Sequence, residues 1–280
     1  MTSAPRTIVL IHGLWMTPLA WEHWVTRYEE RGFTVLTPGY PGIEPGEAGV
    51  AALREDASAL AGVGVREVMD HLTRVVGELD TPPIIMGHSF GGTFAQLLVG
   101  AGLGAAGVSI DGAAVKGVNA MPLSELRSVL PVLRNPANAH RAVPLTAEQF
   151  HYAFTNTLTQ EDSQRAYDRY AVPTPARVLF QGGLAALTPH AATTFDFSDD
   201  ERAPLLFVSG GSDHILPPAV QRQNYERNAK HSTAVTAHAV FEGRDHFTCG
   251  APGWEGVADL ALDWALDPRS GVLDAPTAER

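Results

Sequence analysis

The chain has 280 residues, 45% of them hydrophobic, and a formal net charge of −11. It is long enough to bury one large core, and its length allows one or two domains. Lysine and arginine do not cluster, and the acidic balance argues against a nucleic-acid partner, whose phosphates require such clusters.

The first residues and the single cysteine bear on cellular location. Residues 1–6 carry no basic region before a long apolar run, and residues 8–11 are too few for a signal peptide core or a membrane span. We therefore expect a cytoplasmic protein without membrane association. Cys249 has no partner for an intramolecular disulfide, which fits a reducing compartment. Because it lacks the turn of a nucleophile, we interpret it as a packed thiol.

Short, apolar, β-branched runs alternate with helical periods along most of the chain. The runs predict buried parallel strands at residues 7–11, 34–37, 84–86, 107–110, 205–209 and 235–241. The helical periods cover residues 21–31, 66–78, 91–99, 219–230 and 257–266. This alternation predicts an α/β fold with a doubly wound, mostly parallel sheet and right-handed crossovers.

One long interval, residues 121–203, interrupts the alternation. Helical patterns within it lie near residues 123–133, 147–155 and 160–170. Beyond residue 267 the periodicity disappears, which predicts a flexible C-terminal tail over residues 268–280.

The segment at residues 83–92 reads Pro-Ile-Ile-Met-Gly-His-Ser-Phe-Gly-Gly, an apolar strand followed by Gly-x-Ser-x-Gly and a helical pattern. This is the pattern of a nucleophile elbow, in which Ser89 occupies a strained turn. Gly87 and Gly91 leave room where a Cβ would collide with neighbouring backbone. The serine hydroxyl is then exposed at a helix N-terminus, where backbone N–H groups face a substrate oxygen that gains negative charge.

Three further motifs accompany this elbow. His12-Gly13 follows the first predicted strand, Gly-x-Asp-His-x-x-Pro lies at residues 211–217, and His246 precedes the closing helix. With these motifs, in the order Ser, Asp, His, the chain resembles the α/β-hydrolase superfamily over about residues 6–267, as a serine esterase or lipase with a helical cap.

The resemblance implies a domain organisation. Residues 1–115 and 204–267 would form the hydrolase core, and residues 116–203 would form the cap insertion. The family usually has eight strands, but this chain has no room for the two antiparallel strands that commonly precede the His12-Gly13 strand. We therefore expect about six strands.

Ser89, His246 and a carboxylate are the predicted catalytic residues. Ser89 needs a base to take its proton as it attacks a carbonyl carbon, and His246 follows the last strand, where a loop can place an imidazole over the elbow. Asp213, at the end of strand 205–209, is the candidate acid that orients the imidazole. Asp111, at the end of the preceding strand, is the alternative acid. We expect Asp245 to brace its loop instead.

The resemblance also implies which residues form the oxyanion hole and which line the substrate pocket. The backbone N–H groups of Leu14 and Phe90 would form the oxyanion hole. Trp15 and His12 are candidate pocket residues, although a buried aromatic role for Trp15 and a loop-bracing role for His12 remain open alternatives.

The predicted cap is rich in aromatic residues. Phe150 and Phe154 are candidate pocket residues for an apolar acyl or aromatic group, and the cap also contributes Tyr152, Tyr167, Tyr170 and Phe180. The alternative is that these rings pack only against one another.

No metal or cofactor is expected, since the chain has no His-Glu-x-x-His, no paired cysteines and no Walker-type glycine loop. The predicted function is hydrolysis of a carboxylic ester of a small apolar substrate, with lactones and thioesters left open, through an acyl-enzyme on Ser89. Carbon–carbon hydrolases, perhydrolases, hydroxynitrile lyases and weakly catalytic ligand receptors of the same fold are the alternatives. The sequence does not indicate an oligomeric state.

Overall fold

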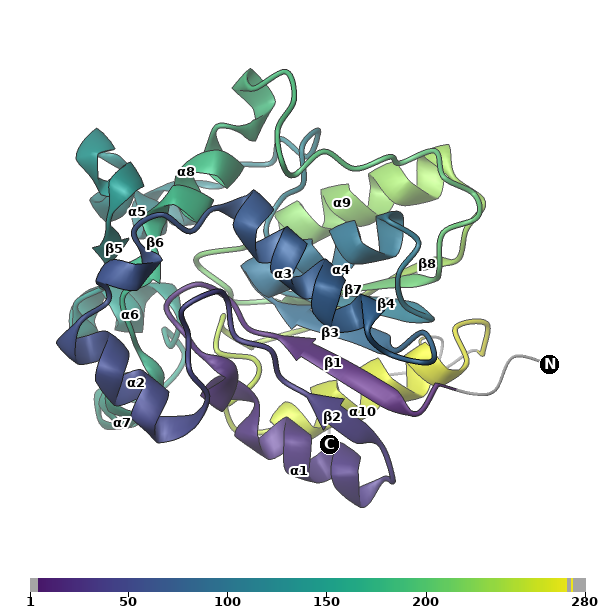
Figure 1. Ribbon diagram of the computed structural model, residues 1–280, viewed down its shortest axis with the longest axis horizontal. Helices are drawn as coiled ribbons and strands as arrows, with labels where there is room; N and C mark the ends of the chain where they lie inside the picture. The colour runs from purple at the N-terminus through teal and green to yellow at the C-terminus, as the bar shows by residue number, and fades with distance from the viewer. Residues whose placement is uncertain (1–4, 271–272, 274–280) are drawn as a thin grey trace.

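The computed structural model describes residues 5–270 and residue 273 (Figure 1). Its centre is a six-stranded sheet in the order β2-β1-β3-β4-β7-β8, and all neighbouring strands are parallel. The strands are β1 (Thr7–Ile11), β2 (Thr34–Leu36), β3 (Ile84–His88), β4 (Ala106–Ile110), β7 (Leu205–Gly210) and β8 (Thr236–Phe241). The predicted six-stranded α/β sheet is confirmed, with strand ends that differ by one or two residues.

Burial explains why these runs form strands. Every residue of β3, β4 and β7 is buried, as expected for parallel strands that helices cover on both faces. The edge strands β2 and β8 are only partly buried.

Helices cover both faces of the sheet (Figure 1). On one face lie α1 (Glu22–Glu30) and α10 (Trp254–Leu266), and on the other lie α3 (Val65–Gly77), α4 (Phe90–Gly100) and α9 (Pro218–His231). Each of the five overlaps a predicted helix. A short 3₁₀ turn, Pro18–Trp21, precedes α1, so this helix begins one residue later than expected.

A second group of elements follows β4 and lies beyond the carboxyl ends of the strands (Figure 1). It contains α5 (Leu123–Leu133), α6 (Ala147–Ala153), α7 (Gln160–Tyr170) and α8 (Ala176–Gly183). The first three match the predicted helical segments. Sequence reasoning missed α8, which is short and ends in two glycines, and the antiparallel pair β5 (Ala142–Val143) and β6 (Thr174–Pro175), whose two-residue strands carry no readable period.

A further helix, α2 (Gly46–Glu55), was not predicted from the sequence. Three 3₁₀ turns, Ser58–Leu60, Pro136–His140 and Ala185–Leu187, complete the described chain. The division at residues 116–203 stays a prediction, and most of the predicted tail, residues 268–280, lies outside the described residues. Within the described part of the chain, no helix is both long and apolar enough to cross a membrane.

Glu22 of α1 connects the core to α7. Its carboxylate accepts two hydrogen bonds from Arg169, at 2.7 and 2.5 Å, and one from the Tyr170 hydroxyl, at 2.5 Å. The Arg169 hydrogen bonds lower the pKa of Glu22, so the carboxylate is ionised at neutral pH. A bidentate arginine pair holds a more defined geometry than a single contact does.

Replacing Glu22 with alanine should lower the free energy of unfolding by about 1 kcal/mol, because the pair is partly solvent-screened. Urea unfolding monitored by tryptophan fluorescence measures this change. Glu161→Ala is the matched control, since Glu161 pairs with Arg165 on the exposed surface of α7 alone and its loss should leave stability unchanged. Equal effects of the two substitutions would contradict the connecting role of Glu22.

Candidate active site

Ser89 lies in the turn between β3 and α4, at φ 57° and ψ −126°. A positive φ is unfavourable for a side chain with a Cβ and persists only where the surroundings impose it. Here the Ser89 N–H donates to the Ile110 carbonyl at 2.9 Å, and the Ser89 carbonyl accepts from the Gly92 N–H at 2.9 Å. The strand, turn and helix of a nucleophile elbow are therefore present.

Three glycines allow the backbone to close around Ser89. A Cβ on Gly87 would lie 2.0 Å from the Gly91 carbonyl oxygen, and a Cβ on Gly91 would lie 2.1 Å from the Ile11 carbonyl oxygen. A Cβ on Gly13 would lie 2.6 Å from the Ser89 Cβ itself. The His12-Gly13 motif thus brings the loop after β1 into direct contact with the serine.

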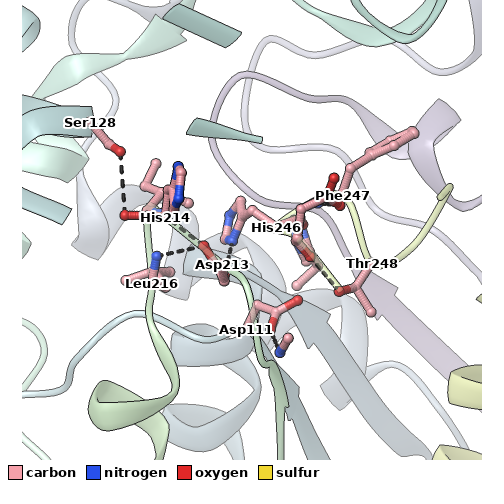
Figure 2. Close-up of polar contacts among 12 residues, drawn as sticks. Asp111, Ser128, Asp213, His214, Leu216, His246, Phe247 and Thr248 are labelled. Atoms are coloured by element: carbon pink, nitrogen blue, oxygen red, sulfur yellow. Dashed lines mark hydrogen bonds and ion pairs between the residues drawn. The ribbon is translucent and has the colours of Figure 1, made fainter. Parts of the chain in front are cut away.

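The structure brings His246 and Asp213 into contact (Figure 2). Nδ1 of His246 lies 2.6 Å from Oδ2 of Asp213, and both side chains are fully buried. Oδ1 of Asp213 accepts from the backbone N–H groups of Ile215 and Leu216, each at 2.8 Å. Burial raises the pKa of Asp213, and these two amides act against that shift. The carboxylate is thus fixed by three donors and points at the imidazole.

The second ring nitrogen of His246, Nε2, is buried and has no hydrogen-bond partner among the described residues. The ring centroid of His246 lies 4.5 Å from that of His88, the residue before Ser89, and the His88 Nε2 lies 2.7 Å from the His246 carbonyl oxygen. Burial lowers the pKa of His246 to about 3, so its ring is neutral at pH 7. With the proton on Nδ1 facing Asp213, Nε2 keeps a free lone pair.

Asp111, the alternative acid, lies beneath this pair (Figure 2). One carboxyl oxygen accepts from the Gly210 N–H at 2.6 Å, and the other has no hydrogen-bond partner among the described residues. Burial and the nearby Asp213 raise the pKa of Asp111 well above its ordinary value. Of the two candidates, Asp213 is therefore the one that contacts His246.

His88, Asp111 and His246 form a compact group whose possible ligand atoms lie within 4.8 Å of one another. Each ring already has a partner, since His88 meets the His246 carbonyl and His246 meets Asp213. One nitrogen of each ring is thus engaged, whereas the His246 Nε2 and one Asp111 oxygen have no hydrogen-bond partner among the described residues.

A cavity of about 260 Å³ opens at Ser89. Leu14 and Phe90, the residues expected to supply oxyanion-hole amides, line it together with the serine. Phe90 is the first residue of α4, so its N–H has no acceptor within the helix. The rest of the wall is mainly aliphatic and includes Leu126, Val129, Leu133, Leu179, Ile215 and Leu216.

Of the four candidate pocket residues, one lines the cavity and three do not. Trp15 lines the cavity, whereas His12, Phe150 and Phe154 do not. Phe150 stacks on Phe154 at a centroid distance of 4.8 Å, and Phe154 meets the His246 ring edge-on at 4.8 Å. These two rings therefore pack in the interior next to His246, and aliphatic side chains of α5 and α8 form part of the cavity wall.

His12 braces the loop after β1, the alternative kept open above. Its Nδ1 lies 2.8 Å from the Gly13 carbonyl oxygen, its ring stacks on Tyr40, and the Tyr40 hydroxyl donates to the His12 carbonyl at 2.6 Å. Trp15 fixes the same loop, because its indole N–H donates to the Val143 carbonyl at 3.0 Å.

Asp245 and Cys249 also behave as interpreted from the sequence. Asp245 accepts hydrogen bonds from the Thr157 hydroxyl at 2.7 Å and from the Phe247 N–H at 3.2 Å, so it braces its loop. Cys249 is buried, and burial raises the pKa of its thiol to about 12.

Sequence reasoning missed most residues of the cavity wall, and among them is one acid, Glu125 of α5. Its place in the first turn of a helix looks like an ordinary dipole-stabilising acid, and nothing in the local pattern distinguishes it.

Several solved structures resemble this one over nearly the whole chain. A monoacylglycerol lipase from Paleococcus ferrophilus shares 18% identity, with a TM-score of 0.62 and coverage of 95% of this chain and 96% of that chain. A pyrethroid hydrolase from Sphingobium faniae shares 20% identity, with a TM-score of 0.63 and coverage of 96% and 98%. An extracellular α/β-hydrolase from a Paenibacillus species shares 21% identity, with a TM-score of 0.62 and coverage of 92% and 98%. At these identities the likeness concerns the fold.

No curated protein matches the sequence significantly. The model of the alpha/beta hydrolase family, by contrast, matches residues 8–260. This match covers most of the chain, including the elbow, Asp213 and His246. The chain therefore belongs to the α/β-hydrolase family.

Proposed function

We propose that the protein is a serine hydrolase that cleaves carboxylic esters of small, mainly apolar substrates through an acyl-enzyme on Ser89. The observation that carries the proposal is the combination of three features, of which the serine and the two residues beside it line one aliphatic cavity. These are a serine on a strained elbow, a buried imidazole bonded to Asp213, and the Leu14 and Phe90 residues beside the serine.

The proposed reaction begins when the Ser89 hydroxyl attacks the ester carbonyl carbon. Its proton passes to the free Nε2 of His246, and Asp213 stabilises the resulting imidazolium. The carbonyl oxygen gains negative charge and accepts hydrogen bonds from the Leu14 and Phe90 amides. His246 then returns the proton to the leaving alcohol. A water molecule, activated by the same imidazole, releases the acid and restores Ser89.

The size and character of the cavity support small, apolar ester substrates. Its volume of about 260 Å³ is near the lower end of the range for ligand pockets. Its aliphatic wall suits a hydrocarbon acyl or alcohol group. Solved proteins of the same fold described as a lipase, pyrethroid hydrolases and an esterase agree with ester chemistry on this scaffold.

Ser89→Ala should leave the fold intact and lower kcat for p-nitrophenyl esters by about a millionfold, because no other side chain replaces the nucleophile. His246→Ala should cause a similar loss, since nucleophile and base act as a unit. Initial rates and circular dichroism measure both properties. A folded Ser89→Ala protein with a near-normal rate would refute the acyl-enzyme.

The two candidate acids should differ sharply. Asp213→Asn should lower kcat about ten-thousandfold, because an amide favours the wrong imidazole tautomer. Asp111→Asn should have a mild effect, since the imidazole of His246 is bonded to Asp213, an amide oxygen can still accept from Gly210, and asparagine tolerates its φ of 45°. Steady-state kinetics of both variants tests the assignment, and reversed magnitudes would transfer the acid role to Asp111.

The pH dependence of kcat/KM should reflect the burial of His246. Catalysis needs the neutral imidazole, so the rate falls as the pH drops through the pKa of this residue. Burial lowers that pKa to about 3, while the charge of Asp245 acts in the opposite direction. We expect the midpoint of the acid limb to lie below 6.5, the ordinary histidine value. A midpoint above that value, measured with a simple alkanoate ester, would contradict this account.

A further inference from the structure

Glu125 is the one carboxyl group in the cavity wall among the described residues. It lies on α5, and the cavity that it lines also contains Ser89. Its Oε2 atom is buried and has no hydrogen-bond partner among the described residues. A buried polar atom without a partner costs free energy, so its presence at a ligand cavity calls for a functional explanation.

The side-chain distribution on α5 departs from that of an ordinary surface helix at several positions, although Val132 is buried. Leu123, Leu126 and Leu130 are 84%, 39% and 48% exposed, whereas the Glu125 carboxyl faces the interior. A helix normally buries its leucines and exposes its acids. Packing alone therefore gives no reason for a glutamate at this position.

Few charges act on Glu125 from the elements around it. α5 packs against α6, α8 and the turn at Pro136–His140, and it contacts the loop after β7 through the Ser128 hydroxyl and the His214 carbonyl. The titratable side chains on these neighbours are Asp213 and His214, Glu148, His151 and Tyr152, Arg177, and His140. Of these, Asp213 is the charge that acts on Glu125. Lys116, also in the cavity wall, directs its ammonium group to the carbonyls of Thr188 and Pro189.

We propose that Glu125 is a specificity-determining residue whose carboxyl group donates a hydrogen bond to an oxygen acceptor of the substrate, remote from the scissile ester. The acceptor would be an ether, ketone or hydroxyl oxygen on an otherwise apolar group. This inference rests on the proposed ester hydrolysis and adds a polar recognition point to an aliphatic cavity.

The protonation state explains why an acceptor is selected. Burial, and then the negative charge of Asp213, raise the pKa of Glu125 to about 8. At pH 7 the carboxyl group is therefore mostly neutral and carries one O–H donor. As the pH rises through 8, the donor is lost and the carboxylate repels oxygen lone pairs. Preference for an oxygen-bearing substrate should thus decline in alkaline solution.

The test compares matched p-nitrophenyl esters. Pentanoate is the hydrocarbon reference, and 2-ethoxyacetate and 3-methoxypropanoate each replace one methylene with an ether oxygen. The measured quantity is kcat/KM for the better ether ester divided by kcat/KM for pentanoate. Comparing this ratio between protein variants cancels the inductive effect of the oxygen on the ester.

In the wild-type protein the ratio should fall as the pH rises through about 8. Glu125→Leu should lower the ratio roughly three- to tenfold at pH 7, the effect of one lost hydrogen bond. Glu125→Gln keeps a donor that does not titrate, so it should retain most of the ratio and remove its pH dependence. Glu148→Gln is the matched control, a first-turn acid of α6 outside the cavity wall, and should behave as wild type.

Three results would overturn the proposal. They are an equal ratio in the wild type and Glu125→Leu, a Glu125→Gln ratio as low as that of Glu125→Leu, and a wild-type ratio independent of pH. If the Glu125→Gln ratio is as low as that of Glu125→Leu and the wild type prefers an ammonium-bearing ester, Glu125 recognises a positive charge instead. If Glu125→Leu fails to fold, the pH dependence of the ratio in Glu125→Gln decides whether the proposal holds.

Calorimetric binding of the same esters to Ser89→Ala separates this proposal from the proposed function. Ether preference in binding that Glu125→Leu abolishes, without turnover by the wild type, would support the Glu125 role and refute ester hydrolysis. Serine-dependent turnover of all the esters, with a ratio indifferent to Glu125, would support hydrolysis and refute the Glu125 role.

Discussion

The φ of 57° at Ser89 depends on close backbone packing from three directions, and the rest of the site is arranged around it. Gly87 and Gly91 let β3 and α4 meet without Cβ atoms, and Gly13 lets the loop after β1 reach the serine Cβ. The same closeness places Leu14 beside Phe90, so the strained turn and the expected oxyanion hole are one structural feature. Strain at this single residue is maintained by the buried parallel sheet, whose central strands leave the turn no room to relax.

The loops that carry Asp213 and His246 are held by the segment between α6 and α7 as well as by the sheet. The Phe247 N–H donates to the Phe154 carbonyl at 2.9 Å, and the Asn156 side chain donates to the Ser212 carbonyl at 3.0 Å. Thr157 adds its bonds to Asp245. The aromatic residues of this region therefore pack against His246 and its loop. This explains why Phe150 and Phe154 are buried and yet absent from the cavity wall.

The strongly periodic parts of the fold could be predicted, and the local details of the site could not. Buried strands such as Ile84–His88 are continuous apolar runs, and Gly-x-Ser-x-Gly specifies its own turn, so the sheet, its helices and the elbow follow from short-range patterns. The short β5 and β6 have no period to detect. Which face of α5 borders the cavity depends on long-range packing, and a first-turn glutamate such as Glu125 looks the same in sequence whether it faces water or substrate.

Burial raises the pKa of three acidic groups around the candidate active site, and hydrogen bonds offset this effect to different degrees. Asp213 has three donors to offset the cost of its charge, whereas Asp111 has one donor and lies close to Asp213. Glu125 has no partner at Oε2 and feels the same neighbouring charge. A single negative charge at Asp213 therefore supports the imidazole and disfavours ionisation of the other two carboxyl groups. With Glu125 neutral, Lys116 is the one charged side chain in the cavity wall among the described residues, and its ammonium group is bonded to the carbonyls of Thr188 and Pro189, so the aliphatic wall suits an uncharged ester.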